Sequence, residues 1–330
     1  MKTYLLAAAA AVVIGAGTAS AEFPERDLQG IIQWGAGGST DVVMRAVTPH
    51  AEEVLGRSVV MTNRTGGVGA IATRYVATQR ADGYTLLMGA ENPQIFKVMG
   101  LGDIDYGDFT PINILARGVP LIVANKSAPF DTFAEMVEYV QANPGKVRMG
   151  STGPGGVPSV IAAMLESEIE LPLTAVPYDG DGPAQTALMG GAVDVLPAVL
   201  GAAIENVRAD RVKPIVLIDN QRNELLPDVP AITEDHPEFE RFLPWGPFFG
   251  IFVHKDTPDE PVEKLRAAFG EAAAQDSFQQ LMDERGFVLM NATGDEAVDF
   301  LNRWQSVTSW LVYDGGIARN SPEDFDIPRP

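Results

Sequence analysis

The chain alternates short apolar runs with amphipathic stretches. Residues 30–34, 58–63 and 85–89 are short runs rich in aliphatic side chains, which predicts buried strands. Between them, residues 40–55 and 69–79 carry apolar side chains at helical spacing. This order of strand, helix, strand, helix and strand predicts a parallel sheet with helices covering both faces.

A second alternating unit follows the first. Its predicted strands are 112–116, 120–124, 147–150, 173–177, 193–196 and 213–218, and its predicted helices are 129–143, 157–166, 183–189 and 201–209. Residues 221–247 hold many prolines and charges and show no clear period, so we expect a loop region. A strongly apolar strand at 248–254, helices at 261–274, 277–285 and 295–313, and a short strand at 288–290 complete the pattern.

Glycine-rich turns recur where a predicted strand leads into a predicted helix, at residues 34–41, 63–69, 150–156 and 178–184. In the first of them, Gly35, Gly37 and Gly38 can adopt positive φ and let another group approach the backbone. Free backbone N–H groups and the helix dipole then favour an anion. One such turn is often only a turn. Four of them suggest loops that face a common cleft.

Residues 1–21 have the pattern of a secretory signal peptide. Lys2 precedes an apolar run over residues 5–14, and Ala19-Ser20-Ala21 is a small-residue cleavage site. The run is too short for a membrane span of about 20 residues, which disfavours the alternative of an uncleaved anchor. We therefore expect export to the periplasm with cleavage after Ala21. The sequence has no cysteine, which excludes a lipoprotein anchor, disulfides and thiol chemistry.

The charge balance narrows the class of partner. The formal net charge is −20, which argues against nucleic acid and anionic membrane surfaces as partners. It does not exclude an anionic ligand. Exposed charges further away than the Debye length of about 8 Å are screened, so dipoles close to the ligand can dominate.

Enzyme motifs are missing from the sequence. There is no phosphate-binding GxxxxGK[ST] loop, no GxGxxG and no HExxH, and the three histidines show no ligand-like spacing. Ser39 and Ser151 stand at turns, where they can cap a helix, bind a ligand or act as nucleophiles, but no GxSxG surrounds either. We expect a protein that is not an enzyme and has no metal or cofactor. A secreted serine hydrolase is the alternative from another class.

Four further side chains have two interpretations each. Asp41, in a predicted first helical turn, is either a cap and dipole partner or a contact for an ammonium or hydroxyl group on a ligand. Glu91 is either solvated or a group that accepts from a donor on the ligand. Trp34 and Trp245 are either core residues or pocket walls, and Trp34, beside the glycines, is the better candidate for a wall.

Several blocks of the chain together resemble one protein family, the exported solute-binding receptors of tripartite tricarboxylate transporters, known as the Bug or TctC family. Residues 33–41, QWGAGGSTD, resemble its strand and Pro-Phe-x-x-Gly-Gly-x-x-Asp turn. Similar blocks are TNRTGGVG at 62–69, ADGYTLL at 81–87, DYGDFTPI at 105–112, GSTGPG at 150–155, YDGDGPA at 178–184 and GGAVD at 190–194. The resemblance covers essentially all of the chain after residue 21.

The resemblance implies an α/β fold of the two-domain periplasmic-binding-protein type, with a ligand cleft between two doubly wound α/β domains. It places one domain at 22–122 plus 250–330 and the other at 123–249. It further implies a small organic carboxylate gripped by backbone amides and helix N-termini, and delivery to the membrane permease subunits of a tripartite tricarboxylate transporter. We expect a monomer. A receptor that feeds a sensor kinase needs the same ligated shape and is an alternative.

The candidate ligand-binding residues follow from the turns and the resemblance. Turns 34–41 and 178–184 would present amides to carboxylates, while 90–92 and 151–153 would contact the rest of the ligand. The candidates are Trp34, Ala36, Gly37, Gly38, Ser39, Thr40, Asp41, Glu91, Asn92, Ser151, Thr152, Gly153, Tyr178, Gly180, Pro183 and Ala184.

This sequence departs from the family pattern around the expected cleft. Gln33 replaces the usual proline, Asp179 stands where a lysine is frequent, and Gly156 and Ser159 replace the usual serine and histidine. The cleft is thereby expected to be more acidic. A hydroxylated, amino-bearing or aromatic carboxylate is then as plausible a ligand as a plain dicarboxylate.

Overall fold

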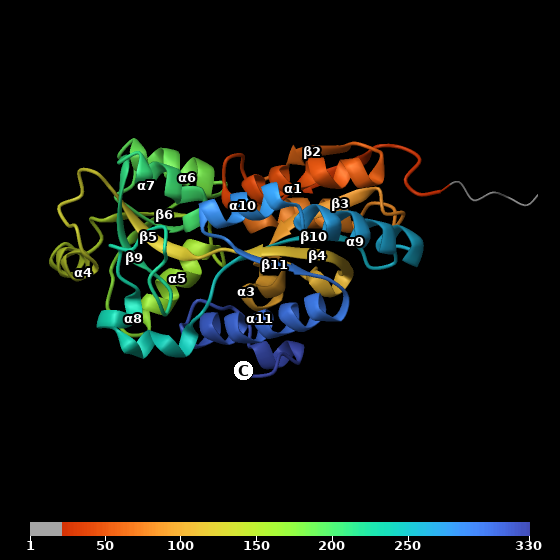
Figure 1. Ribbon diagram of the computed structural model, residues 1–330. Coiled ribbons are helices and arrows are strands. Elements are labelled where there is room, and N and C mark those ends of the chain that lie inside the picture. The colour runs from red at the N-terminus through yellow and green to blue at the C-terminus, as the bar shows by residue number, and fades with distance from the viewer. Residues whose placement is uncertain (1–21) are drawn as a thin grey trace, which may run out of the picture.

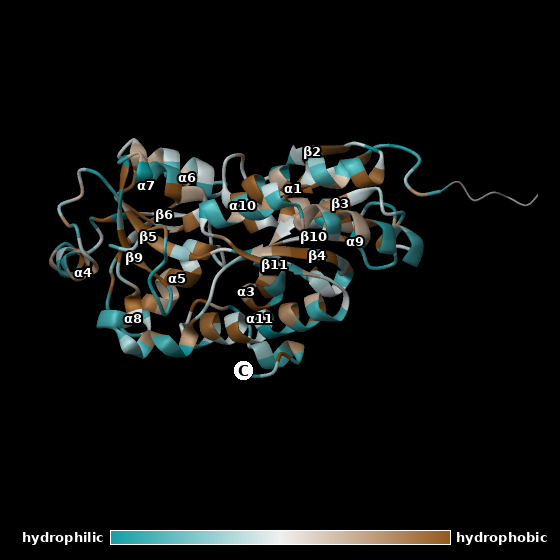
Figure 2. Ribbon diagram, in the orientation of Figure 1, coloured by the Kyte–Doolittle hydropathy of each residue, from teal (hydrophilic) through white to brown (hydrophobic). Residues whose placement is uncertain are grey.

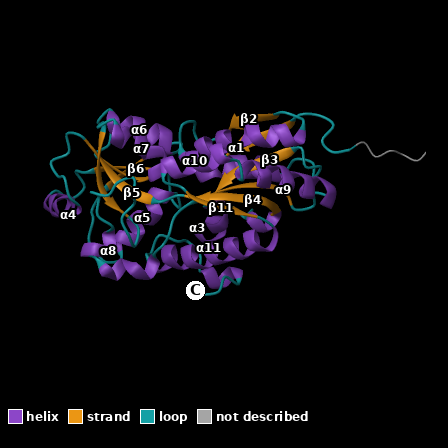
Figure 3. Cartoon of the chain, viewed as in Figure 1, coloured by secondary structure: helices purple, strands orange, loops and turns teal. Residues whose placement is uncertain are grey.

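The computed structural model of the protein describes residues 22–330, which fold into two α/β lobes side by side (Figure 1). The predicted signal peptide, residues 1–21, lies outside the described residues. Each lobe is built on its own sheet, and helices surround the strands of both (Figure 3).

The first sheet has six strands in the order β11-β4-β10-β3-β1-β2. They are β1 (Leu28–Ile32), β2 (Val59–Asn63), β3 (Thr85–Ala90), β4 (Phe109–Arg117), β10 (Phe248–His254) and β11 (Val288–Ala292). Strand β1 pairs in parallel with β2 and β3, as the pattern predicts, whereas β10 runs antiparallel between β3 and β4. The sheet is therefore mixed, because β10 returns to it from the other lobe.

The helices of this lobe are α1 (Ser39–Leu55), α2 (Ala70–Ala77), α3 (Phe96–Met99), α9 (Asp259–Ala273), α10 (Asp276–Arg285) and α11 (Gly294–Asp314). Helices α1, α9 and α10 cover one face of the sheet, while α3 and α11 lie on the other (Figure 1). The sheet is thus covered on both faces, as short apolar strands require.

The second sheet has five strands in the order β7-β6-β8-β5-β9. They are β5 (Pro120–Asn125), β6 (Arg148–Ser151), β7 (Thr174–Pro177), β8 (Val195–Val199) and β9 (Val212–Leu217). The helices of this lobe are α4 (Phe133–Ala142), α5 (Val157–Glu166), α6 (Asp181–Met189), α7 (Leu200–Arg208) and α8 (Ile232–Asp235). Strand β6 is parallel to β7 and β8, and β5 runs antiparallel between β8 and β9.

Two chain segments connect the sheets. One joins β4 directly to β5, and the other returns from β9 through α8 to β10. They touch where the backbone N–H of Gly118 donates to the carbonyl of Pro247 over 2.8 Å. The predicted domain boundaries, 122/123 and 249/250, fall inside β5 and β10, and the division into those domains stays a prediction.

Apolar side chains fill the space between sheets and helices. The strands are hydrophobic along most of their length, while the outward faces of the helices are polar (Figure 2). The apolar runs predicted as inner strands are buried; for example, every residue of β5 and β8 is buried. The edge strands β2, β7 and β11 are more exposed.

The predicted helices and strands are present within a few residues of their expected bounds, and the differences are local. The predicted loop at 221–247 contains α8 and a 3₁₀ segment, Pro237–Phe242. The segment after β3, expected to be a loop, winds into a 3₁₀ turn, Asn92–Ile95, and the single turn α3. Pro93 lies near the start of that 3₁₀ turn, a position where the fixed φ of proline suits helical geometry.

Candidate functional site

The turn after β1 brings backbone N–H groups to the edge of the first sheet. Gly37 has φ of 77°, a conformation that favours glycine. Helix α1 then starts after Gly38, whose position as N-cap offers no side-chain acceptor to the first N–H groups of the helix. Asp41 instead accepts from the N–H of Gly37 over 3.0 Å and holds the turn in shape.

A second helix start faces the first from the other lobe. Helix α6 begins at Asp181 after Gly180, whose φ is 131°. The two turns touch: the N–H of Gly35 donates to the carbonyl of Asp179 over 3.0 Å, and the Ser39 hydroxyl donates to the Asp181 carboxylate over 3.1 Å. The predicted facing of turns 34–41 and 178–184 is therefore present in the structure.

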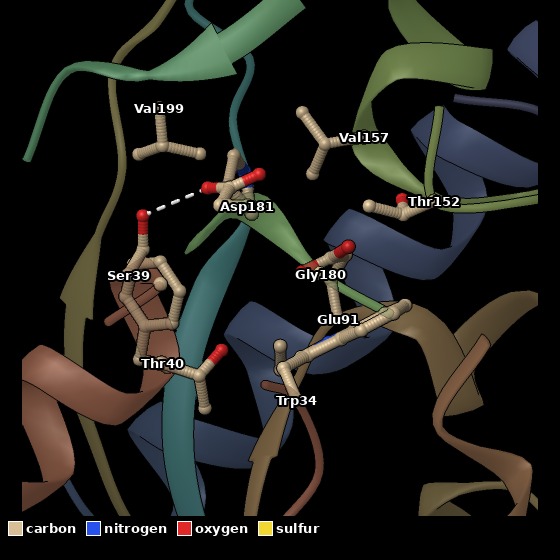
Figure 4. Close-up of a pocket in the computed structure, with 13 residues that line it drawn as sticks. Trp34, Ser39, Thr40, Glu91, Thr152, Val157, Gly180, Asp181 and Val199 are labelled. Atoms are coloured by element: carbon tan, nitrogen blue, oxygen red, sulfur yellow. Dashed lines mark hydrogen bonds between the residues drawn. The ribbon is translucent and has the colours of Figure 1, made fainter. Parts of the chain in front are cut away.

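A pocket lies between the lobes where these turns meet (Figure 4). Its walls come from the carboxyl ends of β1, β3, β6 and β8 and from β10. Figure 4 shows Val157 and Val199 at the top of the pocket and Trp34 and Thr40 at the bottom. The lining residues are Trp34, Gly38, Ser39, Thr40, Ala90, Glu91, Thr152, Val157, Gly180, Asp181, Val199, Pro247 and Phe249.

Four helices begin at this pocket. The N-terminal ends of α1, α5, α6 and α7 follow Gly38, Gly156, Gly180 and Val199, and none of these four residues makes a side-chain capping bond. Uncapped helix starts present N–H groups and the positive end of the helix dipole. The pocket can therefore hold a carboxylate without any basic side chain.

The ionisable side chains of the pocket are both acidic. Burial raises the pKa of Glu91 to about 8, with a further increase from the charge of Asp181. Burial raises the pKa of Asp181 to about 6, while the hydrogen bond from Ser39 lowers it. Among the residues that the structure describes, no lysine, arginine or histidine lines the pocket.

The segment that carries Glu91 is fixed by buried polar contacts. Gln33 accepts from the backbone N–H of Ala90 over 3.0 Å, and Tyr106 donates its hydroxyl to the carbonyl of the same residue. Asn92 accepts from the indole N–H of Trp34 over 3.2 Å and donates to the carbonyl of Gly155 in the other lobe over 3.0 Å. The backbone beside Glu91 and the side chain of Trp34 are thus held in place by neighbouring residues.

A wider groove of about 580 Å³ lies next to the pocket and shares Trp34 and Thr152 with it. Three more of the predicted residues, Gly153, Tyr178 and Pro183, line this groove. Ala36 and Gly37 line a third depression together with Pro183. Seven of the predicted residues line the pocket itself: Trp34, Gly38, Ser39, Thr40, Glu91, Thr152 and Gly180.

The remaining four predicted residues do not line the pocket. Asp41 is occupied by Arg45 at 2.8 Å and by Asn63 at 2.9 Å, so the cap interpretation describes it better. Asn92 accepts a hydrogen bond from the indole N–H of Trp34, and Ser151 accepts from the N–H of Gly153 over 3.1 Å. Ala184 is buried in the core of the second lobe.

Six residues of the pocket were not among the named candidates: Ala90, Val157, Asp181, Val199, Pro247 and Phe249, of which Ala90 and Asp181 lie within the predicted segments 90–92 and 178–184. Asp181 lies inside a turn that was singled out, and its position at a helix start was the available signal. Val199 and Phe249 look like ordinary core residues of apolar strands. Only the crossing of β10 from one lobe to the other brings Phe249 to the pocket.

The two serines lack the partners that a hydrolase needs. Ser39 donates to Asp181, and within residues 22–330 each histidine makes its contact elsewhere. His50 pairs with Ser277, His236 with Glu238, and His254 with the backbone of Asp256. Those described residues also contain no group of three potential metal ligands. Trp245 is a core residue whose indole donates to Thr308.

Two α/β lobes joined by crossing segments, with a pocket between facing helix N-termini, define a periplasmic solute-binding protein. The family model for the tripartite tricarboxylate transporter family receptor, TctC, matches residues 43–309. The chain belongs to this family, which confirms the resemblance inferred from its turns.

Individual relatives agree with this assignment. Protein BugT of Bordetella pertussis is 28% identical over 303 residues, which is 89% of this chain and 92% of that protein. MatC of Rhodopseudomonas palustris, solved with bound malate, is 28% identical with a TM-score of 0.80, covering 89% of this chain and 100% of that one. Another R. palustris structure, with adipate, is 25% identical with a TM-score of 0.83, covering 90% and 99%.

Among residues 22–330, no helix combines the length and the apolar character needed to cross a bilayer.

Proposed function

We propose that this protein captures a small organic carboxylate in the pocket between its lobes and delivers it to the permease subunits of a tripartite tricarboxylate transporter. The observation that carries the proposal is the convergence of four helix starts without side-chain caps on one pocket. Membership of the receptor family and the malate and adipate held by two structural relatives support it.

Carboxylate capture would use backbone N–H groups at Ser39 and Thr40 and at Gly180–Asp181. Trp34 and Phe249 would pack against the carbon skeleton of the ligand, and Thr152 would hydrogen-bond its polar groups. Helix dipoles and N–H groups stabilise an anion at short range, where the net charge of the protein is screened. No bond of the ligand needs to be broken, so the proposed role is binding and not catalysis.

Ligand entry would require the lobes to part. The pocket encloses about 30 Å³, room for about two water molecules by the same measure. Hydrogen bonds from Gly35 to Asp179, from Ser39 to Asp181 and from Asn92 to Gly155 hold the two rims together. Hinge motion about the crossing segments near Gly118 would open and close the cleft.

The location and assembly follow from the same proposal. The protein would be exported to the periplasm, with its signal peptide cleaved after Ala21, and would act as a monomer. The permease would recognise the closed, ligated lobes, so that it receives only loaded receptor.

Isothermal titration calorimetry against mono-, di- and tricarboxylates tests the proposal. We expect at least one acid to bind in a one-to-one complex. If the folded protein binds none of the acids in a panel that spans these classes, the proposed function is wrong.

A further inference from the structure

We propose that the ligand of this pocket carries a protonated amine beside its carboxylate, and that Glu91 and Asp181 accept hydrogen bonds from that amine. This inference rests on the proposed function and names the substrate class of the same site. Its starting point is one buried oxygen atom of an acidic side chain, Oε2 of Glu91, which the protein leaves without a hydrogen-bond partner.

Glu91 is the side chain with the unmet hydrogen bond. It lines the pocket, is only 3% exposed, and its Oε2 atom has no hydrogen-bond partner. A buried carboxyl oxygen without a donor destabilises the folded protein, because it has lost its hydrogen bonds to water and forms none with the protein. A donor that arrives with the ligand removes this penalty only in the complex.

The residues around Glu91 leave its Oε2 atom without a donor, although its own backbone N–H and the Asn92 side chain act on the carboxyl group. Gln33 and Tyr106 fix the backbone at Ala90, and Asn92 is bound to Trp34 and to Gly155. These contacts lie on both sides of Glu91 in the chain, so its side chain stays at the pocket wall. The charged side chain that acts on Glu91 is Asp181, which is also acidic.

A plain dicarboxylate matches this wall poorly. Among residues 22–330 the pocket is lined by two carboxyl groups and by no cationic side chain, so a second ligand carboxylate beside them would meet the negative charge of Asp181 and could bind next to Glu91 only while Glu91 keeps its proton. An ammonium group offers up to three N–H donors and a positive charge. It would satisfy Oε2 of Glu91 and approach Asp181, whose Oδ2 already accepts from Ser39.

The same pocket has a separate place for the ligand carboxylate. The helix starts after Gly38, Gly156 and Val199 have no side-chain caps, although the N–H groups of Ser159 and Leu200 already donate to backbone carbonyls. A zwitterion with adjacent amine and carboxylate therefore meets donors on one side and acceptors on the other. Because donors and acceptors lie on different sides of the pocket, it favours an amino acid over an unsubstituted or hydroxylated acid of the same length.

Calorimetry on matched acids tests the inference. The three series are succinate, malate and aspartate; glutarate, 2-hydroxyglutarate and glutamate; and propionate, lactate and alanine. In at least one series we expect the amino member to bind at least tenfold more tightly than both of its siblings. Glu91→Gln should reduce this preference at least tenfold, because an amide cannot balance the ammonium charge.

Two further variants keep the test decisive. Asp181→Asn should also reduce the preference for the amino member of a series. If Glu91→Gln fails to fold, the result with Asp181→Asn decides the test. Glu53→Gln, an exposed change of the same chemistry on α1, should leave both affinity and preference unchanged.

The outcomes separate the two proposals. If acids bind but the unsubstituted or hydroxylated member is as tight as the amino member in every series, the inference is overturned and the proposed function stands. A preference for the amine that survives in both Glu91→Gln and Asp181→Asn also overturns it. If no acid binds at all, the proposed function is wrong, and the inference that rests on it is wrong as well.

Discussion

The hydroxyl of Ser39 donates to the carboxylate of Asp181 over 3.1 Å, although 142 residues separate them in the chain. Ser39 is the first residue of α1 in one lobe, and Asp181 is the first residue of α6 in the other. The bond therefore joins two helix starts across the cleft, and it closes one side of the pocket in Figure 4.

Removing this hydroxyl should loosen the closed form. In Ser39→Ala the carboxylate of Asp181 loses a donor, and a hydrogen bond of this kind contributes about 1–2 kcal/mol. We expect ligand affinity to fall by about tenfold, measured by calorimetry with the best acid of the panel. Ser58→Ala, an exposed serine in the same lobe, is the control and should bind normally. An unchanged affinity in Ser39→Ala would show that the bond does not contribute to closure.

The contact between the two turns is tight enough to be blocked by one methyl group. A Cβ atom on Gly182 would lie 2.3 Å from the carbonyl oxygen of Ala36 and 3.1 Å from the amide nitrogen of Gly38. Gly182→Ala should therefore prevent closure and weaken binding at least tenfold. Because alanine favours a helix more than glycine does, thermal stability should not fall.

The matched control for this change is Gly270→Ala. Gly270 is also a helical glycine, in α9, and a Cβ there would meet nothing within 4 Å. The Gly270→Ala variant should bind the ligand as tightly as the unmodified protein does. Normal binding by Gly182→Ala as well would mean that the rims do not approach as closely in the complex as they do in this structure.

Buried Glu91 should make the protein less stable as pH rises. Its pKa is raised from 4.5 to about 8 in the folded state, so between these values the folded protein holds a proton that the unfolded chain has lost. Stability is therefore full below pH 4.5 and is lost as pH rises towards 8. Each pKa unit corresponds to about 1.36 kcal/mol, so this one group removes about 4 kcal/mol between pH 5 and 8.

Urea denaturation at several pH values measures this effect. The unfolding free energy of the unmodified protein relative to Glu91→Gln should fall with pH by roughly that amount, since glutamine does not titrate. Glu53→Gln should show no such pH-dependent difference. A difference that stays constant or grows with pH would contradict the burial of an unpaired carboxyl at position 91.

Binding of an amino acid should release protons. The titratable groups at Glu91 are Asp181 across the pocket and Tyr106 beneath it, whose pKa is raised by burial, and no cationic side chain of the described residues lines the pocket. An ammonium ion favours the ionised form of Glu91, so affinity should rise with pH between about 6 and 8. Titrations in two buffers of different ionisation enthalpy count the protons.

An acid without an amine should behave in the opposite way. A second carboxylate near Glu91 favours its protonated form, so binding would take up protons and weaken as pH rises. In Glu91→Gln the proton exchange should become small for either class of ligand. Proton uptake with aspartate, glutamate or alanine would contradict the role assigned to Glu91.

Much of the fold could be predicted from the sequence because the signals are local. Short apolar runs, helical spacing and glycine-rich turns predicted the order of strands and helices. The facing of turns 34–41 and 178–184 was predicted from the recurrence of glycine-rich turns and from the resemblance to the receptor family. The mixed character of the first sheet did not follow. Nothing in the apolar run at 248–254 tells that it returns antiparallel between β3 and β4.

The site was predictable in part for the same reason. Trp34, Ser39 and Glu91 follow strand ends, and they line the pocket. Asp41 was a candidate from its place in the turn and from the resemblance, but Arg45 and Asn63 use its oxygen atoms, and only three-dimensional proximity reveals that competition. Phe249 could not be predicted as a pocket residue, because a buried strand residue has the same sequence pattern whether or not it borders a cavity.

The small volume of the pocket would have a kinetic consequence for the proposed capture of a ligand. A ligand with several non-hydrogen atoms needs more than about 30 Å³, so exchange must wait until the rims separate. Dissociation would then proceed no faster than this separation, and the residence time of the ligand would be set by interlobe bonds such as that between Gly35 and Asp179 as much as by the ligand's own contacts.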